Sequence, residues 1–371
     1  MSDTNQEANP TAIGSLIRGQ REALHMTVAK LATRVGVSRN TITNYESGKT
    51  EPSASDLVRL SAALGCTVQD LLGEGVSSNL PRFAFRAHVP LRKDPEVIIA
   101  AQRYLRAYDE IEEITGSRLH VKLRTFDGDD PLSDREIESA ADTLRQTSGL
   151  HDTGPENIAS VLEGLGVRTL FFSHDVKGLE GLSTMQGEMI LVLLPDRKRA
   201  VERTIFSAAH ELGHLVLHPH LFTDDDVEEA TNTKRYEEEA DKFAGSFLVP
   251  SDELVRVWKD ERLNKHSLFN ALILLKRVFH VSFHCLYRRV TELKLHDRMD
   301  WPVFVNYIKD RLGIDRRCRA SKEDLEPEPL DPNVLYRTTR FDRLVHSAFL
   351  QNLIGVSKVA EMFQVPVDRA K

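Results

Sequence analysis

The sequence predicts a multidomain, mainly α-helical protein with one small sheet in its middle. Apolar residues recur at helical spacing over most of the chain, and two short β-rich runs interrupt that spacing after residue 165. The length of 371 residues exceeds what a single small core supports, which favours two or three domains. With 41% hydrophobic and 28% charged residues and a net charge of -7, the composition is that of an ordinary globular chain.

Composition narrows the class of protein. Cys66, Cys285 and Cys318 lie far apart and form no CxxC pair, so we expect a reducing, cytoplasmic compartment rather than a disulfide framework. No run approaches the ~18 apolar residues of a membrane span, and the polar N-terminus lacks the apolar segment of a signal peptide, so we expect no membrane partner. Net acidity argues against indiscriminate coating of nucleic acid but allows one local basic face that reads DNA.

Turn-forming residues and changes in the spacing of apolar residues divide the chain into domains and connecting segments. We expect a disordered tail over residues 1–10, an all-α bundle of five short helices over 11–75, a linker over 76–94 that starts in the Gly/Ser/Pro-rich segment 73–82, an α+β domain over 95–295, and a helical or mixed C-terminal region of unknown role over 296–371. Within the α+β domain the periods predict helices at 95–114, 133–145, 155–164, 203–217, 236–248, 267–275 and 283–293, and strands at 167–172 and 189–194.

The first module carries the pattern of a helix-turn-helix. Gly36 permits the positive φ of a tight turn between two amphipathic segments, and Ser38 can cap the helix that follows. The exposed side of that helix offers Arg39, Asn40, Thr43 and Asn44. Arg and Asn side chains bind guanine and adenine edges, and residues 11–55 hold six cations against three anions, so a DNA-reading surface is the favoured interpretation. A plain helical protein-binding bundle is the alternative.

The segment VGVSRNTITNYESGKTEPSASDLVRLSAALG resembles the XRE (phage-repressor-like) helix-turn-helix family, over roughly residues 12–73. The resemblance implies that base edges are met by Arg39, Asn40 and Asn44, and phosphates by Ser38 and Lys49. It also implies a homodimer that reads an inverted repeat in double-stranded DNA. Val28 stands where the family often has Gln, so the usual contact at that position is missing.

A second group of candidate functional residues lies in IFSAAHELGHLVLH, where His210, Glu211 and His214 form an H-E-x-x-H pattern. Positions i and i+4 share one helical face, so both imidazoles can reach one metal ion. Glu211 lies beside them and can take a proton from water at the metal. The opposite face is apolar, which predicts a helix that buries one side and offers the other: Ile205, Ala208, Ala209, Leu212, Leu215 and Val216.

A third ligand is available in YEEEADKFAGSFLVP, where Glu237 and Asp241 are spaced i, i+4 on a second predicted helix. A catalytic zinc site has three protein ligands and one open position, which the two histidines and Glu237 would supply. Asp241 would hydrogen-bond a ligand imidazole from behind. Glu238 and Glu239 offer competing carboxylates, and spacing alone does not choose among them.

These two segments resemble the ImmA/IrrE family of zinc-dependent endopeptidases, over about residues 155–250 and more weakly to about 360. The resemblance implies a zincin-like domain with a small sheet and a gluzincin-like site. One Zn²⁺ per chain would be held by His210, His214 and Glu237, with Glu211 as the catalytic base. Asp241 stands at the family's Asn/Asp position.

Weaker signals stay open. His218 and His220 follow the H-E-x-x-H pattern, and we expect surface groups without an assigned role. The strand 189–194 is either an edge that binds a substrate strand or a buried core strand. Residues 268–293 have a helix-turn-helix look, but we prefer an extra bundle packed on the peptidase domain. The acidic run 223–230 is interpreted as a solvated loop.

Together these features predict a cytoplasmic, DNA-binding transcription regulator with a zinc endopeptidase domain. Its substrate would be a regulatory protein, namely a partner repressor, an antitoxin or the chain itself in the linker, cleaved on a signal. The main alternative is a transcription factor whose metal domain senses zinc or a ligand without proteolysis. A third is a protease of a toxin–antitoxin or mobile-element system that the first module only recruits. Glu211 favours catalysis, because a structural zinc closed by four protein ligands needs no base beside it.

Overall fold

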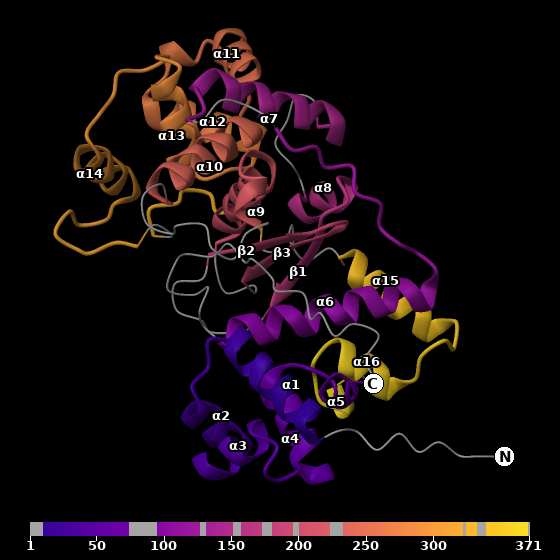
Figure 1. Cartoon of the computed structure of the whole chain (residues 1–371). Coiled ribbons are helices and arrows are strands. Elements are labelled where there is room, and N and C mark those ends of the chain that lie inside the picture. The colour runs from indigo at the N-terminus through magenta and orange to yellow at the C-terminus, as the bar shows by residue number, and fades with distance from the viewer. Residues whose placement is uncertain are drawn as a thin grey trace.

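A computed structural model describes residues 10–73, 95–126, 131–150, 157–172, 180–195, 200–222, 233–321, 324–331 and 339–369. These residues form a mainly helical molecule with one small three-stranded sheet, as the sequence predicts (Figure 1). Of the predicted tail only Pro10 is described, and it begins the first helix. The predicted linker 76–94 and the acidic run 223–230 lie outside the described residues.

The first module contains α1 (Pro10–Ala23), α2 (Val28–Val35), α3 (Arg39–Glu46), α4 (Ala54–Leu64) and α5 (Val68–Leu72). Gly36 has a φ of 75°, and the Ser38 hydroxyl accepts a hydrogen bond from the backbone N–H of Thr41 at 3.0 Å, which confirms the predicted turn and cap. Arg21 of α1 and Glu46 of α3 form a buried ion pair, with Nε and Oε1 2.6 Å apart. These two charges therefore stabilise the module and take no part in a basic surface.

The sheet has the order β1-β3-β2, formed by β1 (Arg168–Phe172), β2 (Leu182–Gln186) and β3 (Met189–Pro195). β3 runs parallel to β1 and antiparallel to β2, so both of its edges are paired. The hypothesis that this strand offers an edge to a substrate is therefore wrong, and its alternative, a buried core strand, is correct. Successive side chains of β3 alternate between two cores, with Ile190, Val192 and Leu194 in one and Leu191 and Leu193 in the other.

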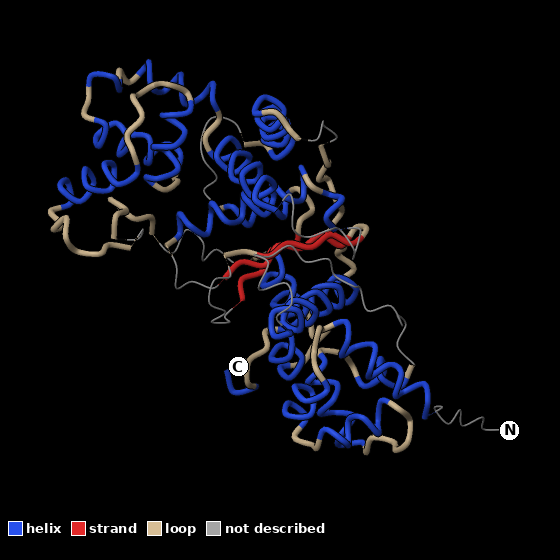
Figure 2. The backbone as a smooth tube through the Cα atoms, turned by 60° about the vertical axis from the view of Figure 1, so that its left-hand side comes forward, coloured by secondary structure: helices blue, strands red, loops and turns tan. Residues whose placement is uncertain are grey.

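One face of the sheet is covered by the helices between β1 and the C-terminal segment, together with two that precede β1 (Figure 2). They are α7 (Asp134–Ser148), α8 (Ile158–Gly164), α9 (Val201–Leu217), α10 (Thr233–Leu248), α11 (Ser251–Asp260), α12 (Leu268–Phe279), α13 (Phe283–Glu292) and α14 (Trp301–Leu312). α9 contacts β2 and β3 and packs along α10, which packs against α7. α12 and α13 belong to the same core, as an extra bundle would, and Arg289 of α13 is buried.

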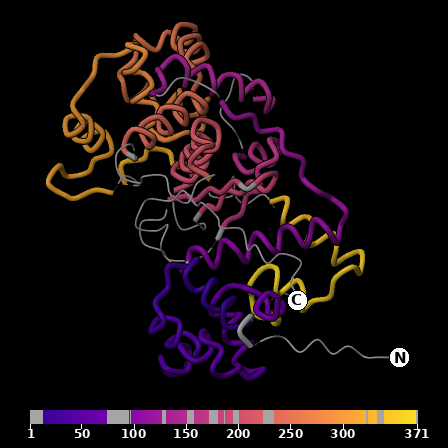
Figure 3. Tube along the Cα trace, viewed as in Figure 1, coloured from indigo at the N-terminus to yellow at the C-terminus, as the bar shows by residue number. Residues whose placement is uncertain are grey.

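The other face is covered by α6 (Pro95–Thr115), α15 (Arg340–Leu350) and α16 (Val356–Met362), which share a core with the first module (Figures 1 and 3). The fully buried Glu112 of α6 joins three elements, because it pairs with Arg168 of β1 at 2.6 Å and with Arg340 of α15 at 2.5 Å. Residues 95–115, which the sequence places in one domain with the H-E-x-x-H helix, thus lie on the opposite side of the sheet from it.

None of the helices among the described residues is long and apolar enough to cross a membrane by itself. α12 and α13 meet that test only as a pair, and their axes are bent by 106° relative to each other.

Candidate functional site

The predicted metal ligands lie on α9 and α10, two antiparallel helices that pack against each other. The apolar face predicted for α9 is buried, with Ile205, Ala208 and Leu212 fully removed from solvent. This fixes the rotation of α9, so that His210 and His214 point to α10. Glu237 of α10 faces both histidines, with its carboxylate oxygens 3.2 Å from His210 Nε2 and 3.6 Å from His214 Nε2.

The three side chains converge on one point. The Nε2 atoms of His210 and His214 are 3.0 Å apart, and one donor atom from each of the three residues lies within 4.8 Å of the others. Two imidazole nitrogens and one carboxylate oxygen are the donor set that a catalytic zinc ion uses. The geometry and the chemistry of these residues therefore fit a metal ion. The side of the cluster that carries no protein ligand is open to a cavity.

The electrostatics of the cluster favour a cation. Burial lowers the pKa of the His210 imidazole, but hydrogen bonds to Asp241 and Glu237 outweigh burial and raise that pKa to about 10. Burial raises the pKa of Glu237, but its hydrogen bonds with the two histidines hold the pKa well below the usual range. Positive charge at this point is thus stabilised by the surrounding carboxylates, whether a proton or a metal ion supplies it.

Hydrogen bonds from behind orient both imidazoles. Asp241 Oδ1 lies 2.9 Å from His210 Nδ1, so Nδ1–H donates to the carboxylate and the Nε2 lone pair faces the cluster. Behind His214 stands a longer relay of buried groups. His218 Nε2 donates to Glu239 Oε2 at 2.8 Å, which leaves its Nδ1 to accept from His214 Nδ1–H at 3.1 Å. This assignment again turns the Nε2 lone pair of His214 toward the cluster.

Four residues that the sequence left open are resolved here. His218 is 1% exposed, so the expectation of a surface histidine is wrong for it, whereas His220 is exposed. Glu239 turns inward to His218, and Glu238 is exposed and lies 3.6 Å from Lys234. The spacing of His214 and His218, i and i+4 like that of His210 and His214, was the signal that a third histidine shares this face.

Glu211 lies beside the ligands on the floor of the cavity. Its Oε2 accepts a 2.5 Å hydrogen bond from the Ser183 hydroxyl of β2. Gly181 makes room for it, because a Cβ there would stand 2.8 Å from Glu211 Oε1 and from its Cγ. The sequence reveals neither contact, since both depend on how β2 lies against α9.

The cavity at this site has a volume of about 260 Å³. It is bounded by the two residues that precede β2 on one side and by α9 and α10 on the other. Its lining residues are Glu180, Gly181, Phe206, Ser207, His210, Glu211, Glu237 and Asp241. The Glu211 carboxylate and two of the three converging donors, His210 and Glu237, therefore face one common space, and His214 is buried beside them.

The second predicted site lies on α3, at the end of the molecule far from the sheet (Figure 1). Ser38, Arg39, Asn40, Thr43 and Lys49 are exposed, and Asn44 is half-buried. Ile42 and Tyr45 are buried on the other side of the helix. The polar side chains thus form one outward face, and Thr43 partly uses its hydroxyl to hydrogen-bond the carbonyl of Arg39.

Comparisons with known protein families match the two parts of the chain that contain these residues. Residues 17–71 match the helix-turn-helix family, and residues 162–291 match the IrrE N-terminal-like domain, a peptidase family. The chain joins an XRE-type helix-turn-helix module to an IrrE-like peptidase domain. α9, α10 and the sheet lie within the second match, and α3 lies within the first.

Two phage repressors are similar to part of the chain. Repressor protein C2 of Salmonella phage P22 is 31% identical over 102 residues, 27% of this chain and 47% of the relative. The cryptic phage CTXphi transcriptional repressor RstR of Vibrio cholerae is 33% identical over 57 residues, 15% of this chain and 51% of the relative. The chain spans about half the length of these curated relatives. A crystal structure of ComR from Streptococcus suis aligns over 96% of this chain and 94% of its own, at 13% identity and a TM-score of 0.17, too low to support a structural comparison.

Proposed function

We propose that this protein is a DNA-binding transcription regulator whose IrrE-like domain is a zinc-dependent endopeptidase acting on a regulatory protein. The observation that carries the proposal is the convergence of His210, His214 and Glu237 on one point, with the carboxylate of Glu211 beside them in an open cavity. Three donors with an open side suit a catalytic ion, and a purely structural ion would be enclosed by four.

In this proposal the two histidines and Glu237 hold one Zn²⁺. Such an ion polarises a peptide carbonyl and lowers the pKa of water. Asp241 and the His218–Glu239 relay keep both imidazoles in the tautomer that presents Nε2. Their role is therefore to position the ligands.

Glu211 acts as the general base. It accepts the proton of the attacking water at Oε1, the oxygen that Ser183 does not bond, and passes it to the leaving amine. The Ser183 hydroxyl fixes the rotamer of the carboxylate, and the absence of a Cβ at Gly181 permits that position.

The substrate backbone adds along β2. Among the described strands β2 is at the edge of the sheet, and Ser183 places it directly beside Glu211. An extended segment hydrogen-bonded to this edge would run past the cluster, by the mode of strand addition that was one of two alternatives for residues 189–194.

The first module selects the DNA site. Arg39, Asn40, Thr43 and Asn44 face base edges in the major groove, and Ser38 and Lys49 contact phosphates, in a homodimer on an inverted repeat. The phage repressors that match this part of the chain support that role. Cleavage of a partner repressor, an antitoxin or this chain itself would then change transcription at the selected site.

The test compares wild type with Glu211→Gln. The amide accepts no proton, so the variant should bind one zinc per chain and hydrolyse nothing, while His210→Ala and Glu237→Ala should lose zinc. Zinc content is measured by elemental analysis, and new protein N-termini are mapped in cells that carry each form. Identical N-termini in wild type and Glu211→Gln, with zinc bound in both, would refute the peptidase and favour a non-proteolytic zinc or ligand sensor.

A further inference from the structure

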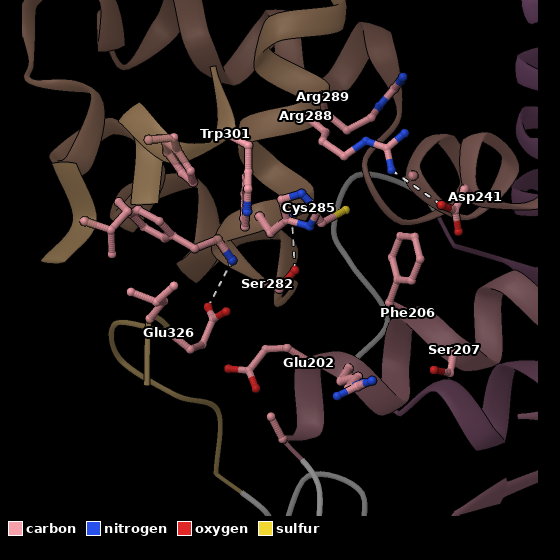
Figure 4. Close-up of a pocket in the computed structure, with 18 of the residues that line it drawn as sticks. Glu202, Phe206, Ser207, Asp241, Ser282, Cys285, Arg288, Arg289, Trp301 and Glu326 are labelled. Atoms are coloured by element: carbon pink, nitrogen blue, oxygen red, sulfur yellow. Dashed lines mark hydrogen bonds and ion pairs between the residues drawn. The ribbon is translucent and has the colours of Figure 1, made fainter. Parts of the chain in front are cut away.

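A second cavity adjoins the metal-ligand cavity, on the side of α13 and α14 (Figure 4). Its volume is about 250 Å³. Four residues, Glu180, Phe206, Ser207 and Asp241, line both cavities, so the two share a wall at the candidate active site. Figure 4 shows Phe206 and Asp241 at this border and Trp301 across the space.

The wall away from the metal ligands is largely aromatic and aliphatic. Trp301, Phe304 and Val305 lie on one face of α14 at spacings of three and four residues, and all three line the cavity. The ring of Phe304 stacks on Tyr287 with centroids 3.9 Å apart, which makes that part of the wall rigid. Trp301 packs edge-on against His284, and it is 42% exposed, so its indole forms the rim.

Several of the charged groups in the wall are held in ion pairs. Glu202 and Glu326 both bind the buried Lys276, and Arg289 pairs with Glu138 and Glu292. The contact between Arg288 and Asp241 is long, at 3.5 Å, and lies at the border with the metal-ligand cavity (Figure 4). The interior thus offers apolar contact and selects for no single charge.

We propose that this cavity is the subsite for a large apolar or aromatic side chain of the polypeptide being cleaved, close to the scissile bond. The proposal rests on the peptidase function, because it takes the metal-ligand cavity as the place of cleavage. The cavity volume of about 250 Å³ has room for one large side chain and lies at the small end of sites for drug-sized molecules, which span roughly 300–1,000 Å³. The rim residue Trp301 lies beyond residues 162–291, so the subsite is built partly outside the peptidase-family match.

Binding is measured first, without turnover. The sequence contains two tryptophans, and Trp258 is buried in the core, so Trp258→Phe leaves Trp301 as the reporter at the cavity. In full-length protein that also carries Glu211→Gln, Trp301 emission is followed while acetylated, amidated pentapeptides are added. Each has Phe, Leu, Ala or Lys between pairs of alanines. We expect saturable blue shifts with Phe and Leu, and at least ten-fold weaker binding with Ala and Lys.

A matched pair of variants locates the binding. Val305→Phe fills the cavity from α14, whereas Val303→Phe makes the same change at an exposed position of the same helix that does not line it. Val305→Phe should weaken binding of the Phe peptide at least ten-fold, and Val303→Phe should leave it unchanged. Equal binding of Phe and Ala peptides, or equal effects of the two variants, would overturn the proposal. So would binding of free N-acetylphenylalanine amide as tightly as the pentapeptide, because that result indicates a small-molecule site.

Cleavage by the zinc-loaded wild type separates this proposal from the peptidase itself. Trp301→Ala alters only the exposed rim, and it should lower kcat/KM for Phe peptides about ten-fold while Ala peptides are unaffected. Cleavage with no preference for large apolar residues at any position would overturn the subsite and leave the peptidase intact. Failure to cleave any peptide would contradict the peptidase, and the fluorescence titration would still decide the side-chain preference.

Discussion

From the buried His218–Glu239 relay behind His214 we predict that Glu239→Gln weakens metal binding. In the structure Glu239 accepts from His218 Nε2–H, and this fixes the proton positions of both histidines. An amide can instead donate to His218 Nε2, which moves the His218 proton to Nδ1, where it would face the proton on His214 Nδ1. His214 would relieve that conflict by carrying its proton on Nε2, the atom that must bind the metal.

The expected loss follows from what such supporting hydrogen bonds contribute. Changing a partner of a metal-ligating histidine costs about 10–100-fold in metal affinity, which corresponds to roughly 1.4–2.7 kcal/mol. A zinc ion held at the proposed site would stabilise the folded state by binding to it, so the stabilisation by zinc should fall by the same amount at a fixed excess of zinc. For a cooperative unit of about 150–250 residues, zinc should therefore raise the Tm of the variant by roughly 3–11 °C less than it raises the Tm of wild type.

The control is Glu238→Gln, the same substitution one residue earlier on the same helix. Glu238 is exposed and contacts Lys234 rather than a histidine, so this variant should bind zinc like wild type. Zinc affinity is measured by competition with a chromophoric chelator, and Tm is measured with and without zinc. If the zinc affinities of the two variants agree within two-fold, the relay has no positioning role and the tautomer argument is refuted.

Three further predictions test the site, the first module and a buried acid. Gly181→Ala should push the Glu211 carboxylate aside and lower kcat about a hundred-fold with zinc retained. The control Gly164→Ala should leave kcat unchanged, because nothing lies within 4 Å of the added Cβ. Equal kcat values for the two variants would refute the close contact. Arg39→Ala should cost roughly 1–3 kcal/mol of binding free energy on the operator alone, and Lys49→Ala should weaken binding to all DNA and lower the salt slope by about 1. Both effects are measured in binding titrations over a salt series. Loss of the operator preference in Lys49→Ala alone would reverse the assignment. Burial raises the pKa of Glu163, so its charge costs stability at neutral pH, and Glu163→Gln should be at least as stable as wild type near pH 7. As pH falls below the unfolded pKa of about 4.3 that cost disappears, and a difference in Tm that grows on acidification would contradict this.

The parts of the site that the sequence predicts are those set within one helix. His210, Glu211 and His214 share a face of α9, and Glu237 and Asp241 share a face of α10, because helical periodicity alone decides both. The contacts between elements were not predictable in the same way. Ser183 lies on β2, whose five residues, LSTMQ, are too few and too mixed in character to show a strand period. Glu239 was one of three adjacent carboxylates, and only the packing of α10 on α9 selects it as the partner of His218.

The placement of α6 changes what the fusion of the two domains implies. β3 contributes alternate side chains to the core under α9 and to the core that contains α6 and the first module. Arg103 of α6 donates to the carbonyl of Ala62 at 2.7 Å, and Arg106 pairs with Asp70 at 3.1 Å. Gly65 packs so closely on α6 that a Cβ there would stand 2.9 Å from Ile99 Cγ2. Exposed ion pairs contribute little, about 0–1 kcal/mol, so the shared apolar core supplies most of the stability of this contact. The helix-turn-helix module is therefore docked on α6 rather than only tethered by the linker. A substrate bound at the same DNA site would have to present its scissile segment within a fixed distance and direction of α3.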